Sequence, residues 1–184
     1  VANQGDSSIT VLQAADLAWV ATIPLGHSPQ YVCIPETGST AMVTTDGGND
    51  VTFIDTGSNA IIGSVASGQS GLYFLAGSPT GSPFALAGPF QIGTHQLSLI
   101  NSSSRTVQSI DLGLTVNTTS GMAMSPDGNH GYVVNYLVPE LLEFNLPSGE
   151  ILRRTLLEYV DIRDIALLEH LPCVRGDMNA DCRL

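Results

Sequence analysis

Three oxygen-bearing side chains alternate near the C-terminal end of this chain. They are Asp177, Asn179 and Asp181, and they stand two positions apart. This spacing lets every second side chain converge on one cation, and carboxylate and amide oxygens are ligands that Ca²⁺ prefers. The pattern therefore predicts a calcium site with these three residues as its metal ligands.

The alternation matches positions 1, 3 and 5 of an EF-hand-type loop but departs from that loop at two places. Cys182 stands at position 6, where the sharp turn needs glycine, and position 12, which supplies the bidentate acid, falls beyond Leu184. The motif resembles the start of a dockerin-type repeat, a calcium-stabilised module of secreted bacterial and archaeal proteins. The resemblance implies that residues 172–184 are a linker and a truncated dockerin-like calcium-loop start.

The other residues that could do chemistry are scattered. The four histidines, His27, His95, His130 and His170, show no metal-ligand spacing such as i, i+4 on a helix. Residues 46–50 are rich in Asp, Gly and Asn, which fits a small cation loop or, more ordinarily, a β-turn. No nucleophile elbow, phosphate-binding loop or dinucleotide fingerprint is present. The sequence therefore assigns no catalytic and no cofactor-binding residue.

A short apolar segment recurs four times and predicts the elements that position these residues. It occupies residues 9–12, 51–54, 97–100 and 141–144, so its start positions are 42, 46 and 44 residues apart. A period in the 40s made of short strands is typical of a β-propeller, in which each repeat is one blade. We therefore predict an all-β propeller of about four four-stranded antiparallel blades.

Each repeat is expected to hold four strands, of which the recurring segment is the third. In one repeat the first two strands are residues 121–124 and 132–135, on either side of a Pro-Asp-Gly turn. The third strand often ends in an acid or an amide, as at Asp55 and Asn101. Many strands are apolar on both faces, which is expected where stacked blades bury both faces of a sheet.

The position within the repeat at which the chain begins and leaves the pattern shows how the repeats are divided along the sequence. Residues 1–3 match the end of a second strand, and residues 164–168 match a first strand. We expect strands at 151–157 and 162–168 rather than a helix, because this keeps the repeat in phase. The two partial units can either close a four-bladed ring, which removes an exposed sheet edge, or belong to a larger ring. The propeller blades are expected over residues 1–171.

Composition and charge exclude several classes of function. The chain is 43% hydrophobic and 12% charged, and no run approaches the roughly 18 apolar residues of a membrane span. All six basic residues are arginines, and the net charge is −11. A surface with this much negative charge repels a phosphate backbone. We therefore expect no nucleic-acid partner. The absence of lysine excludes lysine nucleophiles.

Cysteines and sequons bear on the compartment. Cys33 lies in a predicted strand and is expected to be a buried, small apolar residue. Cys173 and Cys182 flank the acidic C-terminal segment, and a disulfide between them would imply an oxidising compartment. Asn101 and Asn117 begin glycosylation acceptor sequences, which matter only in a cell that glycosylates them.

Several of these segments resemble the YVTN β-propeller repeat. They are residues 1–3, 9–12, 20–29, 125–128 and 131–135, the last reading Gly-Tyr-Val-Val-Asn. The family takes its name from a Tyr-Val-Thr-Asn strand and includes surface-layer and other secreted propellers. The resemblance implies a secreted or cell-surface protein, and it implies that the four units are part of a larger ring. Related propeller lactonases and quinoprotein-like enzymes have catalytic residues for which this chain has no matching motif.

Our leading functional hypothesis is a non-enzymatic extracellular or cell-surface module for binding or scaffolding. Its blade loops would be presented to a protein or glycan partner, or to neighbouring copies of the chain. One alternative is a propeller enzyme of the lactonase or hydrolase type, with a metal at the central channel. Another is a subunit of a surface layer or filament, in which exposed end strands pair between copies.

Overall fold

The computed structural model describes most of the chain up to Glu158. The described residues are 1–35, 38–69, 71–78, 84–89, 96–112, 119–135, 138–146 and 148–158. The predicted calcium ligands Asp177, Asn179 and Asp181, the boundary at 171/172 and the predicted strand at 162–168 lie outside these residues.

The described residues form fifteen β-strands and no helix. The strands are β1 (Ala2–Asn3), β2 (Ser8–Leu12), β3 (Trp19–Pro24), β4 (Pro29–Cys33), β5 (Thr40–Thr45), β6 (Asp50–Asp55), β7 (Ala60–Ala66), β8 (Leu72–Gly77), β9 (Phe84–Pro89), β10 (Gln96–Asn101), β11 (Thr106–Asp111), β12 (Thr119–Met124), β13 (His130–Asn135), β14 (Glu140–Asn145) and β15 (Ile151–Leu156). None of these elements is a helix that could cross a membrane.

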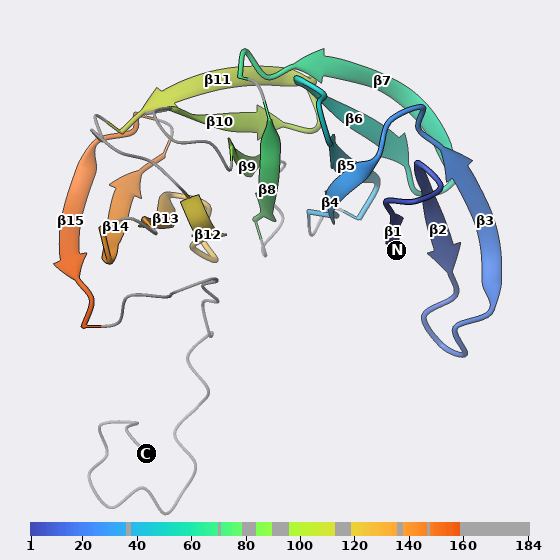
Figure 1. Cartoon of the computed structure of the whole chain (residues 1–184), viewed down its shortest axis with the longest axis horizontal. Helices are drawn as coiled ribbons and strands as arrows, with labels where there is room; N and C mark the ends of the chain where they lie inside the picture. Colours follow the sequence, from blue (N-terminus) through green and yellow to red (C-terminus); the bar gives the residue numbers. More distant parts are fainter. Residues whose placement is uncertain are drawn as a thin grey trace, which may run out of the picture.

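The strands form four antiparallel sheets, which we call blades 1 to 4. Blade 1 is β1-β2-β3, blade 2 is β4-β5-β6-β7, blade 3 is β8-β9-β10-β11 and blade 4 is β12-β13-β14-β15. The blades follow one another along an arc, with β4, β8 and β12 on its inner side and β3, β7, β11 and β15 on its outer rim (Figure 1). The predicted all-β propeller architecture is confirmed. Over the described residues the arc is open, as in part of a larger propeller.

The recurring segment is the third strand of every blade. Its four copies lie in β2, β6, β10 and β14, and each of these strands pairs with the strand before it and the strand after it. Blade 1 begins at its second strand, since Ala2 and Asn3 pair with Ile9 and Ser8. The predicted strand at 151–157 is also confirmed, as β15. The phase read from the sequence is therefore correct wherever the structure describes it.

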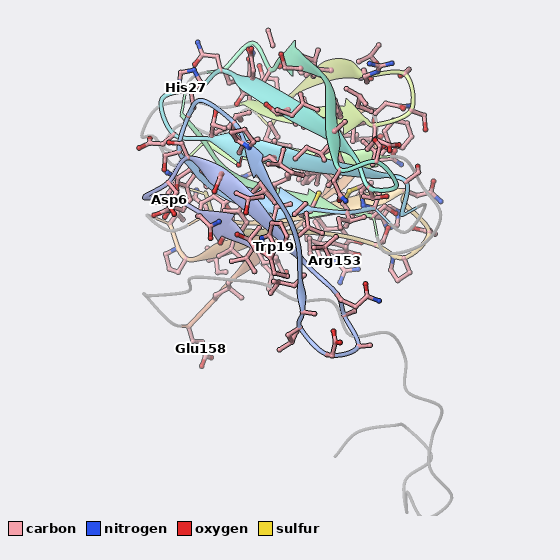
Figure 2. All side chains as sticks on the ribbon, turned by 90° about the vertical axis from the view of Figure 1, so that its right-hand side faces the viewer. Asp6, Trp19, His27, Arg153 and Glu158 are labelled. Carbon is pink, nitrogen blue, oxygen red and sulfur yellow. The ribbon has the colours of Figure 1, made fainter. Side chains whose placement is uncertain are left out.

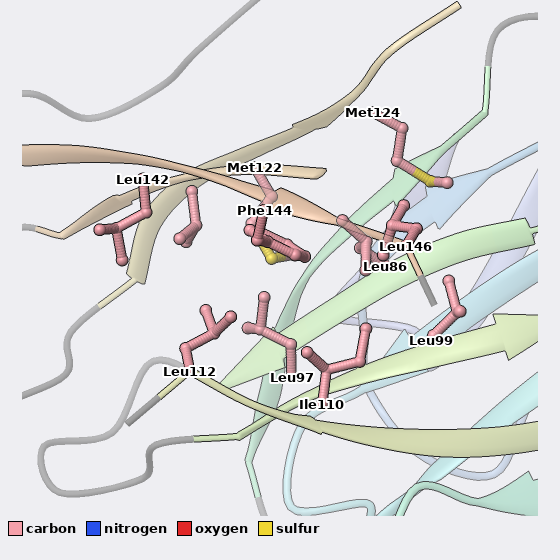
Figure 3. Packing of buried hydrophobic residues seen from close by; sticks show 11 residues of the cluster. Leu86, Leu97, Leu99, Ile110, Leu112, Met122, Met124, Leu142, Phe144 and Leu146 are labelled. Atoms are coloured by element: carbon pink, nitrogen blue, oxygen red, sulfur yellow. The ribbon is translucent and has the colours of Figure 1, made fainter. Parts of the chain in front are cut away.

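Apolar side chains fill the spaces between consecutive blades. One cluster, around Ile9 and Ile54, joins blades 1 and 2, and another, around Phe53 and Ile100, joins blades 2 and 3. The largest cluster joins blades 3 and 4 around the fully buried Phe144 (Figure 3). Blades 2 and 3 are thus packed on both faces, which explains why their strands lack a clear alternation of polar and apolar residues.

The acid or amide at the end of the third strand caps the turn that follows it. Asp55 Oδ1 accepts a hydrogen bond from the Ser58 amide at 2.7 Å, and Asn101 Oδ1 accepts one from the Ser103 amide at 2.9 Å. The hydrogen bonds from Ser58 lower the pKa of Asp55. These residues are therefore turn caps of the Asx type, which is a structural role.

Cys33 is a free thiol at the end of β4. It is half-buried and packs against the cluster between blades 2 and 3. Desolvation by its surroundings raises the pKa of the thiol to about 12, so it stays protonated at neutral pH. It behaves as the small apolar residue expected from the sequence.

Candidate functional site

Three aromatic rings meet where the inner strands of blades 2 and 3 lie side by side. Tyr31 comes from β4, and Tyr73 and Phe74 come from β8. The Tyr31 ring centroid lies 5.9 Å from that of Tyr73 and 5.7 Å from that of Phe74. The Tyr73 and Phe74 centroids are 5.2 Å apart in an edge-to-face arrangement. These distances and tilts are those that aromatic pairs prefer. We call these three residues the inner aromatic surface.

A β-bulge positions these rings on each inner strand. On β4, Pro29 pairs with Thr45 and Tyr31 pairs with Thr44, which leaves Gln30 as the extra residue. On β8, Leu72 pairs with Pro89 and Phe74 pairs with Gly88, which leaves Tyr73 as the extra residue. β12 is irregular at the corresponding place, between Thr119 and Gly121. A bulge redirects side chains locally and occurs often beside binding sites.

The two tyrosine rings are partly exposed to solvent, and contacts within the blades hold the three aromatic residues in place. Tyr31 is 39% exposed and Tyr73 is 38% exposed, whereas Phe74 packs against the cluster between blades 3 and 4. The Tyr31 amide donates to the hydroxyl of the fully buried Thr44 at 3.3 Å, which fixes the backbone beneath the ring. The surface is therefore held from within the blades and presents aromatic area to solvent.

Neutral amides join the strand that carries Tyr31 to blade 1. Gln30, next to Tyr31 on β4, accepts a hydrogen bond from Gln4 Nε2 at 3.0 Å. The Gln4 carbonyl in turn accepts one from the Ser28 hydroxyl at 3.0 Å. The loop between β1 and β2 is thereby tied to the start of β4. This link holds the start of β4, and with it Tyr31, against blade 1.

Among the described residues, blade 4 carries a cluster of ionisable side chains centred on Glu143. Glu143 Oε1 lies 3.5 Å from His130 Nδ1 and accepts a hydrogen bond from the Tyr132 hydroxyl at 3.3 Å. Glu143 Oε2 lies 3.4 Å from Arg153 Nε. Burial, followed by the charge of Glu143, raises the pKa of Tyr132.

Ser125 lies close to this cluster in the sequence but is engaged in a turn. Its hydroxyl donates to Asp127 and accepts a hydrogen bond from the His130 main-chain amide at 2.9 Å. Nucleophilic catalysis by serine needs a base that takes the hydroxyl proton. Here the hydroxyl caps the turn between β12 and β13, so the arrangement is structural.

A shallow groove of about 550 Å³ opens between blades 1 and 2. Thr52 and Ser64 line it from blade 2, and His27 lines it from the linker between β3 and β4. Figure 2 shows His27 at the same edge of the molecule as Asp6, which lies in the loop between β1 and β2. Residues 46–49 form the hairpin turn between β5 and β6, where the Gly48 amide donates to the Thr45 carbonyl at 3.2 Å.

Metal ligands are not grouped in the part of the chain described by the structure. Among these residues, no three His, Cys, Asp or Glu side chains gather as a metal site requires. The calcium ligands predicted from the sequence, Asp177, Asn179 and Asp181, remain a prediction because they lie outside the described range.

Sequence reasoning missed the inner aromatic surface. A signal for it was present, because aromatic residues stand near the start of the first strand in two consecutive repeats, at Tyr31 and at Tyr73–Phe74. That signal shows which strands carry rings. It does not show that the rings meet, because their contact depends on how two blades stack.

Comparisons with known proteins identify the fold but no family. No protein-family model and no curated protein matches the sequence. Among solved structures, hydrazine synthase of Kuenenia stuttgartiensis is similar with a TM-score of 0.63 and 21% identity, over 74% of this chain and 38% of that one. The dihydro-heme d1 dehydrogenase NirN, solved in complex with DHE, is similar with a TM-score of 0.66 and 20% identity, over 85% of this chain and 34% of that one.

These likenesses define the class of the protein. Both similar structures are β-propeller proteins, so the chain is an all-β protein of the propeller class. It spans only 38% and 34% of the length of these two structures. At this level of identity the likeness concerns the fold alone, and the function of the chain must be argued from its own residues.

Proposed function

We propose that this chain is a non-enzymatic binding module that holds a neutral glycan on the inner aromatic surface. The observation that carries the proposal is the exposure of Tyr31 and Tyr73 where two inner strands meet. Large aromatic side chains that are open to solvent yet fixed by their surroundings are typical of recognition surfaces. Here the rings stand on strands, which hold them more rigidly than loops would.

A sugar fits this surface better than a charged ligand. The apolar C–H face of a sugar ring can lie on a tyrosine ring, while its hydroxyl groups bond to neutral polar groups around the rings. The three aromatic residues and Gln30 are all uncharged, so they offer no charge-assisted bond to an acid or an amine. The net charge of −11 also disfavours anionic ligands.

Calorimetric titration with neutral hexose oligosaccharides of different linkage tests this proposal. We expect binding by one linkage class, and a loss of more than about tenfold in affinity for Tyr31→Ala and for Tyr73→Ala, since each removes a stacking face. The matched control is Tyr132→Phe on blade 4, which should bind as tightly as the unmodified chain. Circular dichroism shows whether each variant keeps the fold.

Two outcomes would refute the proposal. One is the absence of binding for every oligosaccharide by the folded, unmodified chain. The other is binding that Tyr31→Ala and Tyr73→Ala leave unchanged, because the ligand would then sit elsewhere.

We also propose that the C-terminal end binds Ca²⁺ as a dockerin-like loop start, with Asp177, Asn179 and Asp181 as ligands. Support comes from the alternating oxygen side chains in the sequence. Calcium titration should give one binding event that Asp177→Ala and Asp181→Ala abolish and that Asp16→Ala leaves intact. Binding that survives the first two substitutions would contradict this assignment. A stoichiometric metal held elsewhere would instead favour the lactonase-type alternative.

An extracellular or cell-surface location completes the proposal. It is supported by the YVTN-like segments and by the glycosylation acceptor sequences that begin at Asn101 and Asn117. A disulfide between Cys173 and Cys182 would accompany this location, because such bonds persist in oxidising compartments. Peptide mapping under non-reducing conditions of protein secreted by its source cell should recover the linked peptides. Recovery of both thiols in reduced form would argue against it.

A further inference from the structure

The linker after blade 1 and the linker after blade 2 follow the same backbone pattern. The Leu25 amide donates to the Ser7 carbonyl at 2.9 Å, and the Ser67 amide donates to the Asn49 carbonyl at 2.7 Å. Ser7 and Asn49 each stand directly before the third strand of a blade. In both linkers the next residue is a glycine with a positive φ angle. The side chains of the two linkers can therefore be compared position by position.

In the linker after blade 2, Gln69 closes the space between blades 2 and 3. Gln69 Nε2 donates a hydrogen bond to the Ser98 hydroxyl on β10 at 3.1 Å, and that hydroxyl donates to the Ser67 carbonyl at 3.2 Å. All three residues are buried. A hydroxyl at this place on the third strand thus accepts a hydrogen bond from an N–H donor.

The same three positions are open between blades 1 and 2. They are held by Leu25, His27 and Thr52, which all line the groove of about 550 Å³. Thr52 corresponds to Ser98, since both are the third residue of the third strand. His27 is exposed, whereas its counterpart Gln69 is 7% exposed. The groove lies between two described blades rather than at an end of the arc, and it lacks the donor that closes the next interface.

A carboxylate, that of Asp50, also lines the groove. Asp50 stands two residues before Thr52 on β6, so both side chains lie on the blade 1 side of that strand. Within the described residues, no hydrogen bond or ion pair engages the exposed Asp50 carboxylate. Apart from Asp50 and His27, the lining residues are uncharged. In blade 3 the position of Asp50 is taken by the neutral Gln96, so the charge is particular to this groove.

Hydroxyl groups and apolar side chains complete the groove. Thr52 on β6 pairs with Ser64 on β7, and both line it. Leu25 and the 45% exposed Ile61 add apolar area. A carboxylate only accepts hydrogen bonds, and hydroxyls also accept them, whereas an ammonium group has three donors and a positive charge. The groove volume lies in the range of small-molecule sites. These features suit a small ligand with an ammonium group and an apolar body.

We propose that the groove between blades 1 and 2 binds a primary aliphatic amine. The ammonium group donates to the Asp50 carboxylate and to the Thr52 hydroxyl, as Gln69 donates to Ser98 in the next interface. The aliphatic chain covers Ile61. This site takes a cationic ligand, so it is separate from the inner aromatic surface and its neutral ligand.

An NMR titration of the full chain with n-butylamine tests this proposal. The readout is the ring resonances of His27, recorded at about pH 8, where histidine side chains are ordinarily neutral. We expect a saturable shift with a Kd of about 1 mM, because so small a ligand supplies little binding energy. Butan-1-ol and butyrate have the same carbon chain without the positive charge. Each should bind at least about tenfold more weakly.

Variants locate the charge and the hydroxyl that the amine uses. Asp50→Asn should weaken binding of n-butylamine by more than about tenfold. Thr52→Val removes one hydrogen-bond acceptor at nearly constant shape and should weaken binding by about two- to tenfold. The matched control is Asp16→Asn, which removes the same charge from the turn between β2 and β3. It should change the affinity by less than about twofold.

Three results would overturn the proposal. The first is the absence of a saturable shift at His27 up to roughly 50 mM n-butylamine. The second is equally tight binding of butan-1-ol, because the groove would then recognise the carbon chain alone. The third is equal weakening by Asp50→Asn and Asp16→Asn, because the amine would then respond only to the net charge of the chain. The comparison of ligands needs no variant, so it decides even where a substitution disturbs the fold.

Discussion

At the scale of single residues, Asp127 shows how one carboxylate fixes a turn. It accepts hydrogen bonds from the Ser125 hydroxyl, from the Asn129 amide at 3.0 Å and from Asn129 Nδ2 at 3.1 Å. These donors, with Ser125 the strongest, lower the pKa of Asp127 to about 2. The Pro-Asp-Gly turn seen in the sequence is therefore held by its ionised acid.

This lowered pKa makes the stability of the chain depend on pH. Since the folded-state pKa of Asp127 lies below its unfolded value of 3.8, the ionised carboxylate stabilises the fold at pH values above about 4. That contribution disappears as the pH falls from about 4 through about 2. We expect Asp127→Asn to reduce stability at neutral pH and to flatten the acid limb of the stability curve.

Urea unfolding at pH values between about 6 and 2 measures this effect. The two curves should converge at the acid end, where Asp127 is protonated. A constant difference between Asp127→Asn and the unmodified chain across this range would show that ionisation of Asp127 does not contribute.

Single residues also mark the limit of what the sequence predicts. The acid or amide at Asp55 and Asn101 was visible as a recurrent feature, and its role as a turn cap follows from local chemistry. Tyr31, Tyr73 and Phe74 were visible only as ordinary strand residues. Their importance comes from contacts between blades, which no local pattern encodes.

At the scale of elements, a hydrogen bond joins the outer parts of neighbouring blades in addition to the apolar packing between them. Arg105, in the turn between β10 and β11, donates from Nη1 to the Ile62 carbonyl on β7 at 2.6 Å. Ile62 is the extra residue of a bulge on β7, between the pairs of Phe53 and Ile54. A bulge leaves its extra residue out of the ladder, so its carbonyl is available to another blade. The contact ties blade 3 to the rim of blade 2.

The strand β13 contains a glycine whose role is set by close packing. A Cβ atom at Gly131 would overlap the ring of Phe144 on the neighbouring strand β14, and Phe144 is fully buried. The ring cannot swing away without disturbing the cluster between blades 3 and 4. Glycine is therefore required at this position for the ring to lie flat against the sheet.

We expect Gly131→Ala to destabilise the chain by about 1–3 kcal/mol, because it overpacks a dense core. The matched control is Gly5→Ala, since a Cβ at Gly5 would meet nothing within 4 Å and should change stability by less than about 0.5 kcal/mol. Chemical denaturation of both variants gives the comparison. Equal stability of Gly131→Ala and the control would show that the ring of Phe144 can relax.

Most elements were predictable, and the reason is physical. The third strand of each repeat is apolar because it packs between two other strands and against neighbouring blades, so its pattern survives in every copy. Bulges such as those at Gln30 and Tyr73 were not predictable, because an extra residue in a ladder leaves no periodic signal. The elements follow from the sequence, whereas the orientation of side chains at the inner rim does not.

At the scale of the whole molecule, the phase of the repeat allowed two shapes. A four-bladed ring and part of a larger ring share the same strands in the same order. The sequence pattern therefore does not favour one shape over the other. The described blades instead follow an open arc (Figure 1). Which shape forms depends on the angle between stacked sheets, and this angle is set by the fit of buried side chains such as Phe53 and Phe144.

The two ends of the arc are chemically different. Blade 1 presents Leu12 and Trp19, whereas blade 4 presents Glu143 with His130 and Arg153. The repeat alone predicts equivalent ends, because it assigns both to the same kind of strand. The difference emerges only when equivalent positions are compared blade by blade.

The central claim is that the inner aromatic surface binds the ligand of this protein. The most direct measurement is an NMR map of the aromatic side-chain resonances during titration with an oligosaccharide that binds. Our account predicts that the largest shifts fall on Tyr31, Tyr73 and Phe74, and that Tyr31→Ala removes them. Shifts at His27 in the groove between blades 1 and 2, or at His130 on blade 4, with the three rings unchanged, would contradict it.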